Sequence, residues 1–147
     1  MLGSSAATAE GELAGTYKLI STTVTYLETG QAVAKDDSGF IMYGRDGRMM
    51  GIILTGDRPK PASIDKITDQ ECIELFRSMV AYGGSYKFDG KTVEHHIDIS
   101  SNAVWTGTTL IRDVKRDGGR LILTTRPAPN PFDGKLVSAT LVWEKVQ

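Results

Sequence analysis

The feature that most constrains this chain is a series of short segments in which apolar and polar residues alternate, separated by turns that contain glycine. Segments 86–88 and 91–99 flank Asp89-Gly90, and segments 105–115 and 120–125 flank a second glycine turn. Alternation with period two is typical of β-strands, and an Asp-Gly pair between two such segments favours a tight hairpin. The sequence therefore predicts a mainly β, antiparallel fold.

Further strands follow from the same pattern. They are expected at residues 15–28, 39–43, 49–54 and 136–144. About eight strands in hairpin order favour an up-and-down barrel, because closure removes exposed strand edges. Such a barrel holds either packed side chains or one small ligand. Small residues expected at inward positions, Ser21, Gly51 and Gly107, favour space for a ligand.

One segment has helical rather than strand periodicity. Thr68 and Glu71 form a capping-box pattern, in which each side chain can hydrogen-bond the backbone amide of the other residue. Apolar residues then recur at helical spacing until Gly83-Gly84, and these are Cys72, Leu75, Phe76, Met79 and Val80. The pattern predicts an amphipathic helix of about four turns that covers an open end or a flank of the barrel. Cys72 would then be an inert core thiol.

Length and charge exclude several functional classes. A chain of 147 residues fits one domain, at residues 12–147, after a disordered leader at residues 1–11. The formal net charge of −1, without a basic stripe, argues against nucleic acid as a partner, and no apolar run is long enough for a transmembrane helix. The single cysteine fits a reducing cytoplasm, and a homodimer is compatible with the composition.

Several motifs occur in one order along nearly the whole chain, from Leu13 to Val146. They are Gly15-Thr16-Tyr17-Lys18-Leu19, Gly56-Asp57-Arg58-Pro59, Ala81-Tyr82-Gly83-Gly84-Ser85-Tyr86, Thr92-Val93-Glu94-His95-His96, Trp105-Thr106-Gly107-Thr108, Arg120-Leu121-Ile122-Leu123-Thr124-Thr125 and Leu141-Val142-Trp143-Glu144. In these motifs the chain resembles the bacterial and fungal lipocalin-like domain family. The resemblance implies a calycin-type barrel with an internal pocket, in a family where some relatives belong to biosynthetic pathways. The chain departs from the family at Asn102-Ala103-Val104, where a phenylalanine–proline pair is more typical.

The segment Thr92–Ile99 holds both histidines of the chain. On a strand, His95 shares an apolar face with Ile97 and Ile99, whereas His96 lies on the opposite, charged face. A buried imidazole needs a hydrogen-bond partner and can titrate near neutral pH, so His95 is the main candidate for a general acid or base, or for a donor to a ligand oxygen. The alternative is a neutral core histidine bonded to a neighbouring tyrosine or to backbone. A register slip of one residue would exchange His95 for His96.

Aromatic and sulfur-containing side chains are expected to face the interior. Four aromatic residues fall on predicted strands, namely Tyr17, Tyr43, Tyr86 and Trp105. They could stack on a flat apolar ligand while their polar groups orient it, or they could pack the core. Tyr86 and Trp105 are the strongest candidates, because their strands flank that of His95. Met49-Met50 is expected to line the pocket or the core.

Charged residues near the barrel mouth are a second group of candidates. Arg58 and Arg126 lie in loops that contain proline, and Arg112 lies in a strand. Each could hold a ligand carboxylate or enolate, with a solvated surface cation as the alternative. Asp113 is expected on an interior face, where it could pair with His95 or with an arginine.

No metal or cofactor is expected. The rings of His95 and His96 diverge to opposite faces of a strand, and the sequence contains no second histidine cluster. The glycine turns join strands, so they do not form a phosphate loop.

Three functional hypotheses follow. The first is a barrel that binds a small, largely apolar, oxygen-bearing molecule, oriented by His95, Tyr86, Trp105 and Arg112. The second is a cofactor-independent isomerase, cyclase or dehydratase, in which His95 shuttles a proton and a tyrosine or arginine stabilises an enolate. The third is an interaction module with a solid barrel, whose function lies in the helix or the proline loops. A second polar group within hydrogen-bond reach of His95 would favour the enzyme.

Overall fold

Strands dominate the structure, a computed structural model that describes residues 12–130 and 133–146. The predicted leader at residues 1–11 lies outside the described residues. The strands are β1 (Gly15–Tyr26), β2 (Ala32–Lys35), β3 (Asp37–Tyr43), β4 (Arg48–Thr55), β5 (Met79–Phe88), β6 (Thr92–Ser100), β7 (Thr109–Asp117), β8 (Arg120–Thr125), β9 (Ala128–Pro129) and β10 (Leu136–Lys145). A 3-10 turn, η1 (Ile64–Lys66), and one helix, α2 (Asp69–Arg77), connect β4 to β5.

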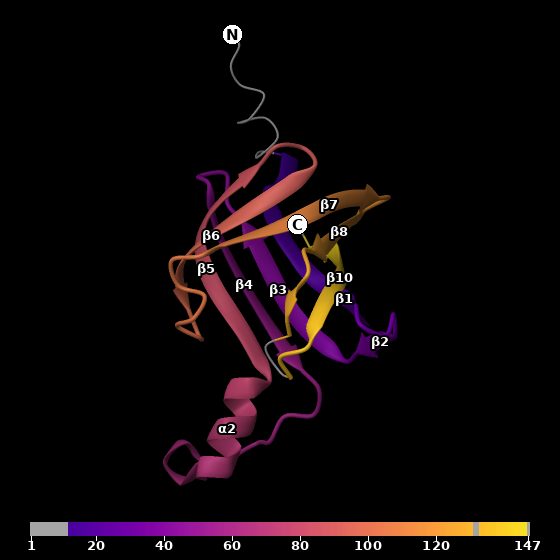
Figure 1. The fold of residues 1–147 in the computed structure, drawn as a ribbon. Helices are drawn as coiled ribbons and strands as arrows, with labels where there is room; N and C mark the ends of the chain where they lie inside the picture. Colours follow the sequence, from indigo (N-terminus) through magenta and orange to yellow (C-terminus); the bar gives the residue numbers. More distant parts are fainter. Residues whose placement is uncertain (1–11, 131–132, 147) are drawn as a thin grey trace.

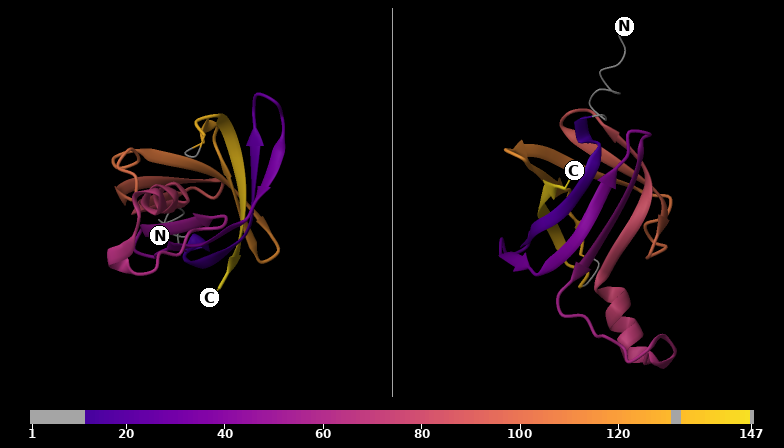
Figure 2. Two further views of the ribbon diagram at one scale, coloured as in Figure 1. Left: turned by 90° about the horizontal axis from the view of Figure 1, so that it is seen from below. Right: turned by 180° about the vertical axis from the view of Figure 1, so that it is seen from behind.

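The strands form one closed antiparallel barrel (Figure 1, Figure 2). In the described part of the chain the barrel has eight strands, in the order β1, β3, β4, β5, β6, β7, β8 and β10, and pairing of β1 with β10 closes it. The short strands β2 and β9 pair with β1 and β10 at the edges. The mainly β, up-and-down barrel predicted from the alternating segments is confirmed.

A packed core fills one end of the barrel. Its buried side chains include Tyr17, Tyr43, Tyr86 and Trp143. The tyrosine rings meet edge to face, with centroids 6.3 Å apart for Tyr17 and Tyr43 and 4.8 Å apart for Tyr43 and Tyr86. Because this end is filled, space remains toward the opposite end, where β4 finishes and β5 begins.

The helix is shorter than predicted and packs little against the barrel. The capping box is present, since the Glu71 amide donates to Thr68 Oγ1 at 3.1 Å and the Thr68 amide donates to Glu71 Oε1 at 2.9 Å. However, α2 ends at Arg77, and Met79 and Val80 belong to β5 because they pair with β4. No residue of α2 is buried, and the helix extends beyond the barrel end (Figure 1). The prediction that its apolar face covers the barrel is therefore wrong.

Two β-bulges change which residues face the interior. In β1, a register shift after Leu19 leaves Ser21 exposed and turns Thr22 inward. In β6, a register shift opposite Gly83 leaves Ile99 exposed. A bulge adds one unpaired residue, so the side chains beyond it change faces. The predictions that Ser21 and Ile99 face inward are therefore wrong.

Several other residues lie where the sequence pattern does not place them. Strand β7 starts later than predicted, so Trp105 and Gly107 lie in the turn before it, and Gly107 is exposed. Met49 is in the core, but Met50 points outward and is exposed. Cys72 is exposed rather than a core thiol, because the face of α2 that carries it is not covered.

Candidate functional site

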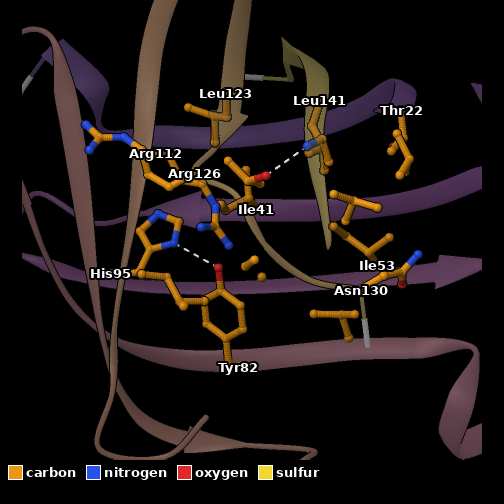
Figure 3. Close-up of a pocket in the computed structure, with 18 of the residues that line it drawn as sticks. Thr22, Ile41, Ile53, Tyr82, His95, Arg112, Leu123, Arg126, Asn130 and Leu141 are labelled. Carbon is orange, nitrogen blue, oxygen red and sulfur yellow. Dashed lines mark hydrogen bonds between the residues drawn. The ribbon is translucent and has the colours of Figure 1, made fainter. Parts of the chain in front are cut away.

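A cavity of about 230 Å³ occupies the part of the barrel that the packed core leaves free (Figure 3). Apolar side chains form most of its wall, and these are Val24, Ile41, Ile53, Val80, Leu110, Leu123, Val137, Ala139 and Leu141. A few polar side chains interrupt this wall, including Tyr82, His95 and Arg112. A largely apolar cavity with few polar groups is the usual form of a small-molecule site. The cavity therefore argues against the solid-barrel hypothesis.

His95 points inward from β6 and is 1% exposed. Its Nε2 atom lies 2.6 Å from the Tyr43 hydroxyl oxygen, and its Nδ1 atom lies 2.8 Å from the Tyr82 hydroxyl oxygen. Burial, followed by the charges of Arg112 and His96, lowers the pKa of His95 from 6.5 to about 3. The expectation that His95 titrates near neutral pH is therefore wrong, and the imidazole is neutral there.

Tyr82 connects this histidine to the cavity. It lines the cavity wall, whereas Tyr43 lies in the packed core, where burial raises the pKa of its hydroxyl well above the usual value. Figure 3 shows Tyr82 and His95 on the same side of the pocket, joined by their hydrogen bond. Tyr82 was not among the predicted site residues, because the predicted helix extended over the start of β5. The signal that could have found it is the alternation of Val80, Tyr82 and Tyr86 along one strand face.

Arg112 brings a positive charge to the cavity. It lies on β7, paired in register with Val93 of β6, and its side chain lines the wall. Its guanidinium donates to the Ile111 carbonyl oxygen at 3.3 Å, and it has no carboxylate partner among the described residues. A cation without a counter-ion beside an apolar wall favours a ligand with an anionic oxygen.

Comparison with protein families agrees with this geometry. The family model of the lipocalin-like domain matches residues 14–146. The chain belongs to the lipocalin-like domain family. Membership confirms the resemblance carried by the sequence motifs, and it indicates small-molecule binding without naming a ligand or a reaction. Comparisons with curated proteins and with solved structures gave no significant match.

Two of the predicted tyrosines lie in the packed end of this lipocalin-like barrel rather than in the cavity wall. The Tyr17 hydroxyl donates to the Leu13 carbonyl oxygen at 2.8 Å, and the Tyr86 hydroxyl donates to the Gly44 carbonyl oxygen at 2.7 Å. Both rings belong to the core cluster, and neither lines the cavity. Tyr43 approaches the cavity only through its hydrogen bond to His95.

Trp105 lines the cavity although it lies in a turn. It comes from the segment between β6 and β7, and its ring centroid lies 6.4 Å from that of Tyr82. The two rings meet edge to face, so Trp105 limits the space beside the Tyr82 ring.

The other charged candidates have protein partners. Arg126 lines the cavity rim, and its Nη2 atom lies 3.0 Å from Asp113 Oδ1 in a half-exposed ion pair. Asp113 thus pairs with an arginine and not with His95. Arg58 does not line the cavity. It donates to Ser78 Oγ at 2.9 Å and to the Leu75 carbonyl oxygen at 3.1 Å, and these hydrogen bonds stabilise the end of α2.

Within residues 12–130 and 133–146, no group of three or more His, Cys, Asp or Glu side chains is placed to hold a metal ion. In the same part of the chain, no helix combines the length and apolar character needed to cross a membrane.

Proposed function

We propose that this lipocalin-like protein binds one small, largely apolar molecule inside its barrel and holds an oxygen atom of that molecule near Tyr82 and Arg112. The observation that carries the proposal is the cavity, whose largely apolar wall includes the hydroxyl of Tyr82 and the cation Arg112 among its polar groups. Such a site gains affinity from the wall and orientation from the polar groups.

The apolar wall would supply most of the affinity. Burial of roughly 200–300 Å² of apolar ligand surface, at about 25 cal/mol per Å², contributes about 5–7.5 kcal/mol before the entropic losses of association. Tyr82 and Arg112 would add a smaller, directional contribution.

Native mass spectrometry of the protein purified from its own host tests the proposal, followed by extraction and identification of bound molecules. We expect one small molecule per chain, with a mass that fits the cavity. A protein that is empty after gentle purification, and that takes up neither aromatic polyketides nor fatty acids, would contradict the proposal.

A variant that fills the cavity provides a matched test. Gly51 lines the cavity next to Ile41, so Gly51→Leu would place a side chain where the ligand is expected. Met50, the preceding residue, points outward, so Met50→Leu changes a neighbouring site without reducing the cavity. Loss of the bound molecule in Gly51→Leu, with retention in Met50→Leu, supports an internal site.

A proton-transferring isomerase, cyclase or dehydratase of a biosynthetic pathway is the second candidate. The observation that favours it is the hydrogen bond between His95 and the cavity-lining Tyr82. Because His95 is neutral near neutral pH, Tyr82 is the better proton donor to a ligand, and an N–H of His95 could stabilise the resulting phenolate.

Incubation of the extracted molecule with the protein in deuterated water separates the two candidates. Proton transfer predicts deuterium in the recovered molecule, at a rate reduced by Tyr82→Phe. A recovered molecule without deuterium and without any change in mass supports binding alone.

The location and the oligomeric state of the protein stay predictions. The single cysteine favours the cytoplasm, and a homodimer is the predicted oligomer. Fractionation of the native host and the mass of the protein in solution would test them.

A further inference from the structure

We infer that the hydrogen-bonded chain Tyr43–His95–Tyr82 makes Tyr82 a donor into the cavity, so that Tyr82 and Arg112 select a ligand with an anionic acceptor oxygen: a carboxylate, an enolate or a phenolate. The inference deepens the proposed function and rests on it for the presence of a ligand. His95 is a positioning residue in this arrangement, because it acts on the ligand through Tyr82.

Tyr43 sets the direction of the chain. Its hydroxyl is buried, and His95 Nε2 is its one hydrogen-bond partner among the described residues. The neighbouring hydroxyls of Tyr17 and Tyr86 each donate to a backbone carbonyl. A buried hydroxyl needs an acceptor for its proton, and Nε2 is the one acceptor within hydrogen-bond distance of the Tyr43 hydroxyl among the described residues. Tyr43 therefore donates to His95.

The tautomer of His95 follows from this donation. A neutral imidazole has one N–H group and one acceptor nitrogen. With Nε2 as the acceptor, the proton is on Nδ1, and Nδ1 donates to the Tyr82 oxygen at 2.8 Å. Burial keeps the ring neutral across the physiological pH range, so the tautomer is stable over that range.

Tyr82 consequently keeps its own proton for a partner in the cavity. Its oxygen accepts from His95, and its hydroxyl has no second hydrogen-bond partner among the described residues. The side chain lines the cavity, with the Trp105 ring on one side. A ligand atom next to this hydroxyl must therefore accept a hydrogen bond.

Arg112 adds a preference for negative charge. Its charge acts on both His95 and Tyr43, which places it close to the hydrogen-bonded chain, and Figure 3 shows it on the His95 side of the cavity. A carboxylate or enolate oxygen can accept from the Tyr82 hydroxyl and from the guanidinium together. An alcohol brings a donor that finds no acceptor at this position, and an ammonium group is repelled.

The tautomer can be measured directly in the full-length protein without a ligand. In nitrogen–proton correlation spectra of the imidazole side chains, the protonated and unprotonated ring nitrogens of a neutral histidine resonate separately. The variant His96→Gln leaves His95 as the single histidine and assigns its signals. We expect the proton on Nδ1, and a proton on Nε2 would overturn the inference.

Two tyrosine variants test the cause of the tautomer. Tyr43→Phe removes the donor to Nε2, so we expect part of the His95 proton to move to Nε2. Tyr17→Phe is the matched control, because it removes another buried hydroxyl of the same cluster without changing a partner of His95. The same His95 tautomer in both variants would overturn the role of Tyr43.

Ligand selection is tested with four probes that share one ring system: 2-naphthoate, 2-naphthylmethanol, 2-naphthylmethylammonium and naphthalene. We expect naphthoate to bind about 10-fold or more tightly than the alcohol, and the ammonium to bind most weakly. Tyr82→Phe should reduce the advantage of naphthoate over naphthalene and leave naphthalene binding unchanged.

The outcomes separate the inference from the proposed function. Equal affinity for naphthoate and the alcohol overturns the selection of an anionic oxygen, while binding of both supports the internal site. If none of the four probes binds, the ligand selection fails, and native mass spectrometry of the protein from its own host decides the proposed function separately. The tautomer measured in the free protein would still decide whether the Tyr43–His95–Tyr82 chain has the stated direction.

Discussion

The Tyr43 hydroxyl oxygen and His95 Nε2 lie 2.6 Å apart, and both side chains are buried. This contact joins the two ends of the barrel interior. Tyr43 packs against the rings of Tyr17 and Tyr86 in the core, while His95 reaches Tyr82 in the cavity wall. Because one polar chain belongs both to the core and to the site, substitutions in it change stability and binding together, and each needs a control from the same region.

Acid should destabilise the protein through His95. In the unfolded chain this histidine has a pKa near 6.5, and in the folded barrel its pKa is about 3, so between these values the unfolded state binds a proton that the folded state does not. The free energy of unfolding therefore contains a contribution that is complete above about pH 6.5 and is lost as the pH falls toward 3. Thermal unfolding of the wild type from about pH 7.5 to about pH 4 should show this loss.

His95→Gln should have a flatter pH profile over the same range, because glutamine does not titrate. His96→Gln is the control, because it replaces the neighbouring histidine on the outer face and leaves the buried His95 in place, so the loss of stability assigned to His95 should persist. An equally steep profile in His95→Gln would show that carboxyl groups carry the dependence. Asp89 is one such group, because backbone hydrogen bonds from Thr92 and Lys91 lower its pKa.

Arg112→Met should separate binding from stability. The guanidinium has no carboxylate partner in the described residues, so its removal should leave the free energy of unfolding within about 1 kcal/mol of the wild type. Binding of 2-naphthoate should fall about 10-fold, and binding of naphthalene should not change. Lys115→Met, which removes an exposed charge from the same strand, is the control. A similar loss of naphthoate binding in both variants would point to net charge rather than to the cavity.

The barrel was predictable because its signals are local. Alternation within each segment and the Asp-Gly turns depend on a few neighbouring residues, and so does the capping box at Thr68. The end of the helix depends on distant residues. Met79 and Val80 fit the apolar spacing of a helix and of a strand equally well, and pairing with β4 decides for the strand. Because the predicted helix extended over the start of β5, Tyr82 was not predicted to face the cavity.

The site was predictable only in part. Strand periodicity predicts which face of the sheet a side chain lies on, but not its position along the barrel axis. His95, Arg112, Tyr17 and Tyr86 all have inward positions, yet the two tyrosines lie in the packed end and the other two line the cavity. Bulges add a second difficulty. The bulge in β1 turns Thr22 inward, and no local sequence signal marks it.

Gly84 should be indispensable for the fold around the β6 bulge. A Cβ atom at this position would overlap the His96 carbonyl oxygen, because the backbones of β5 and β6 approach closely at the register shift. We expect Gly84→Ala to lower the free energy of unfolding by about 3 kcal/mol or more, or to prevent folding. Gly119→Ala is the control, since an added Cβ meets no atom within 4 Å there. Urea unfolding that gives equal stability for the two variants would contradict the close approach.

The helix α2 should be able to unfold while the barrel stays folded. Thr68→Ala removes one half of the capping box, which should weaken the helix by about 1 kcal/mol. Because no residue of α2 is buried, the unfolding midpoint of the whole protein should stay close to that of the wild type. Hydrogen exchange should become faster in residues 69–77 and stay unchanged in β5. A lower midpoint for global unfolding would show that α2 supports the barrel.

The homodimer that the sequence allows should use the outer face of β3 and β4. Two directly paired sets of apolar residues are exposed on this face, Phe40 with Ile52 and Met42 with Met50. Exposed apolar surface of this kind favours association, because burial in an interface removes it from water. We expect the molar mass of the wild type, measured by light scattering, to rise toward that of a dimer with concentration. The double variant Met42→Lys, Met50→Lys should stay monomeric with an unchanged unfolding midpoint, because both side chains point away from the core. A monomeric wild type, or a dimer that survives both substitutions, would exclude this face as the interface.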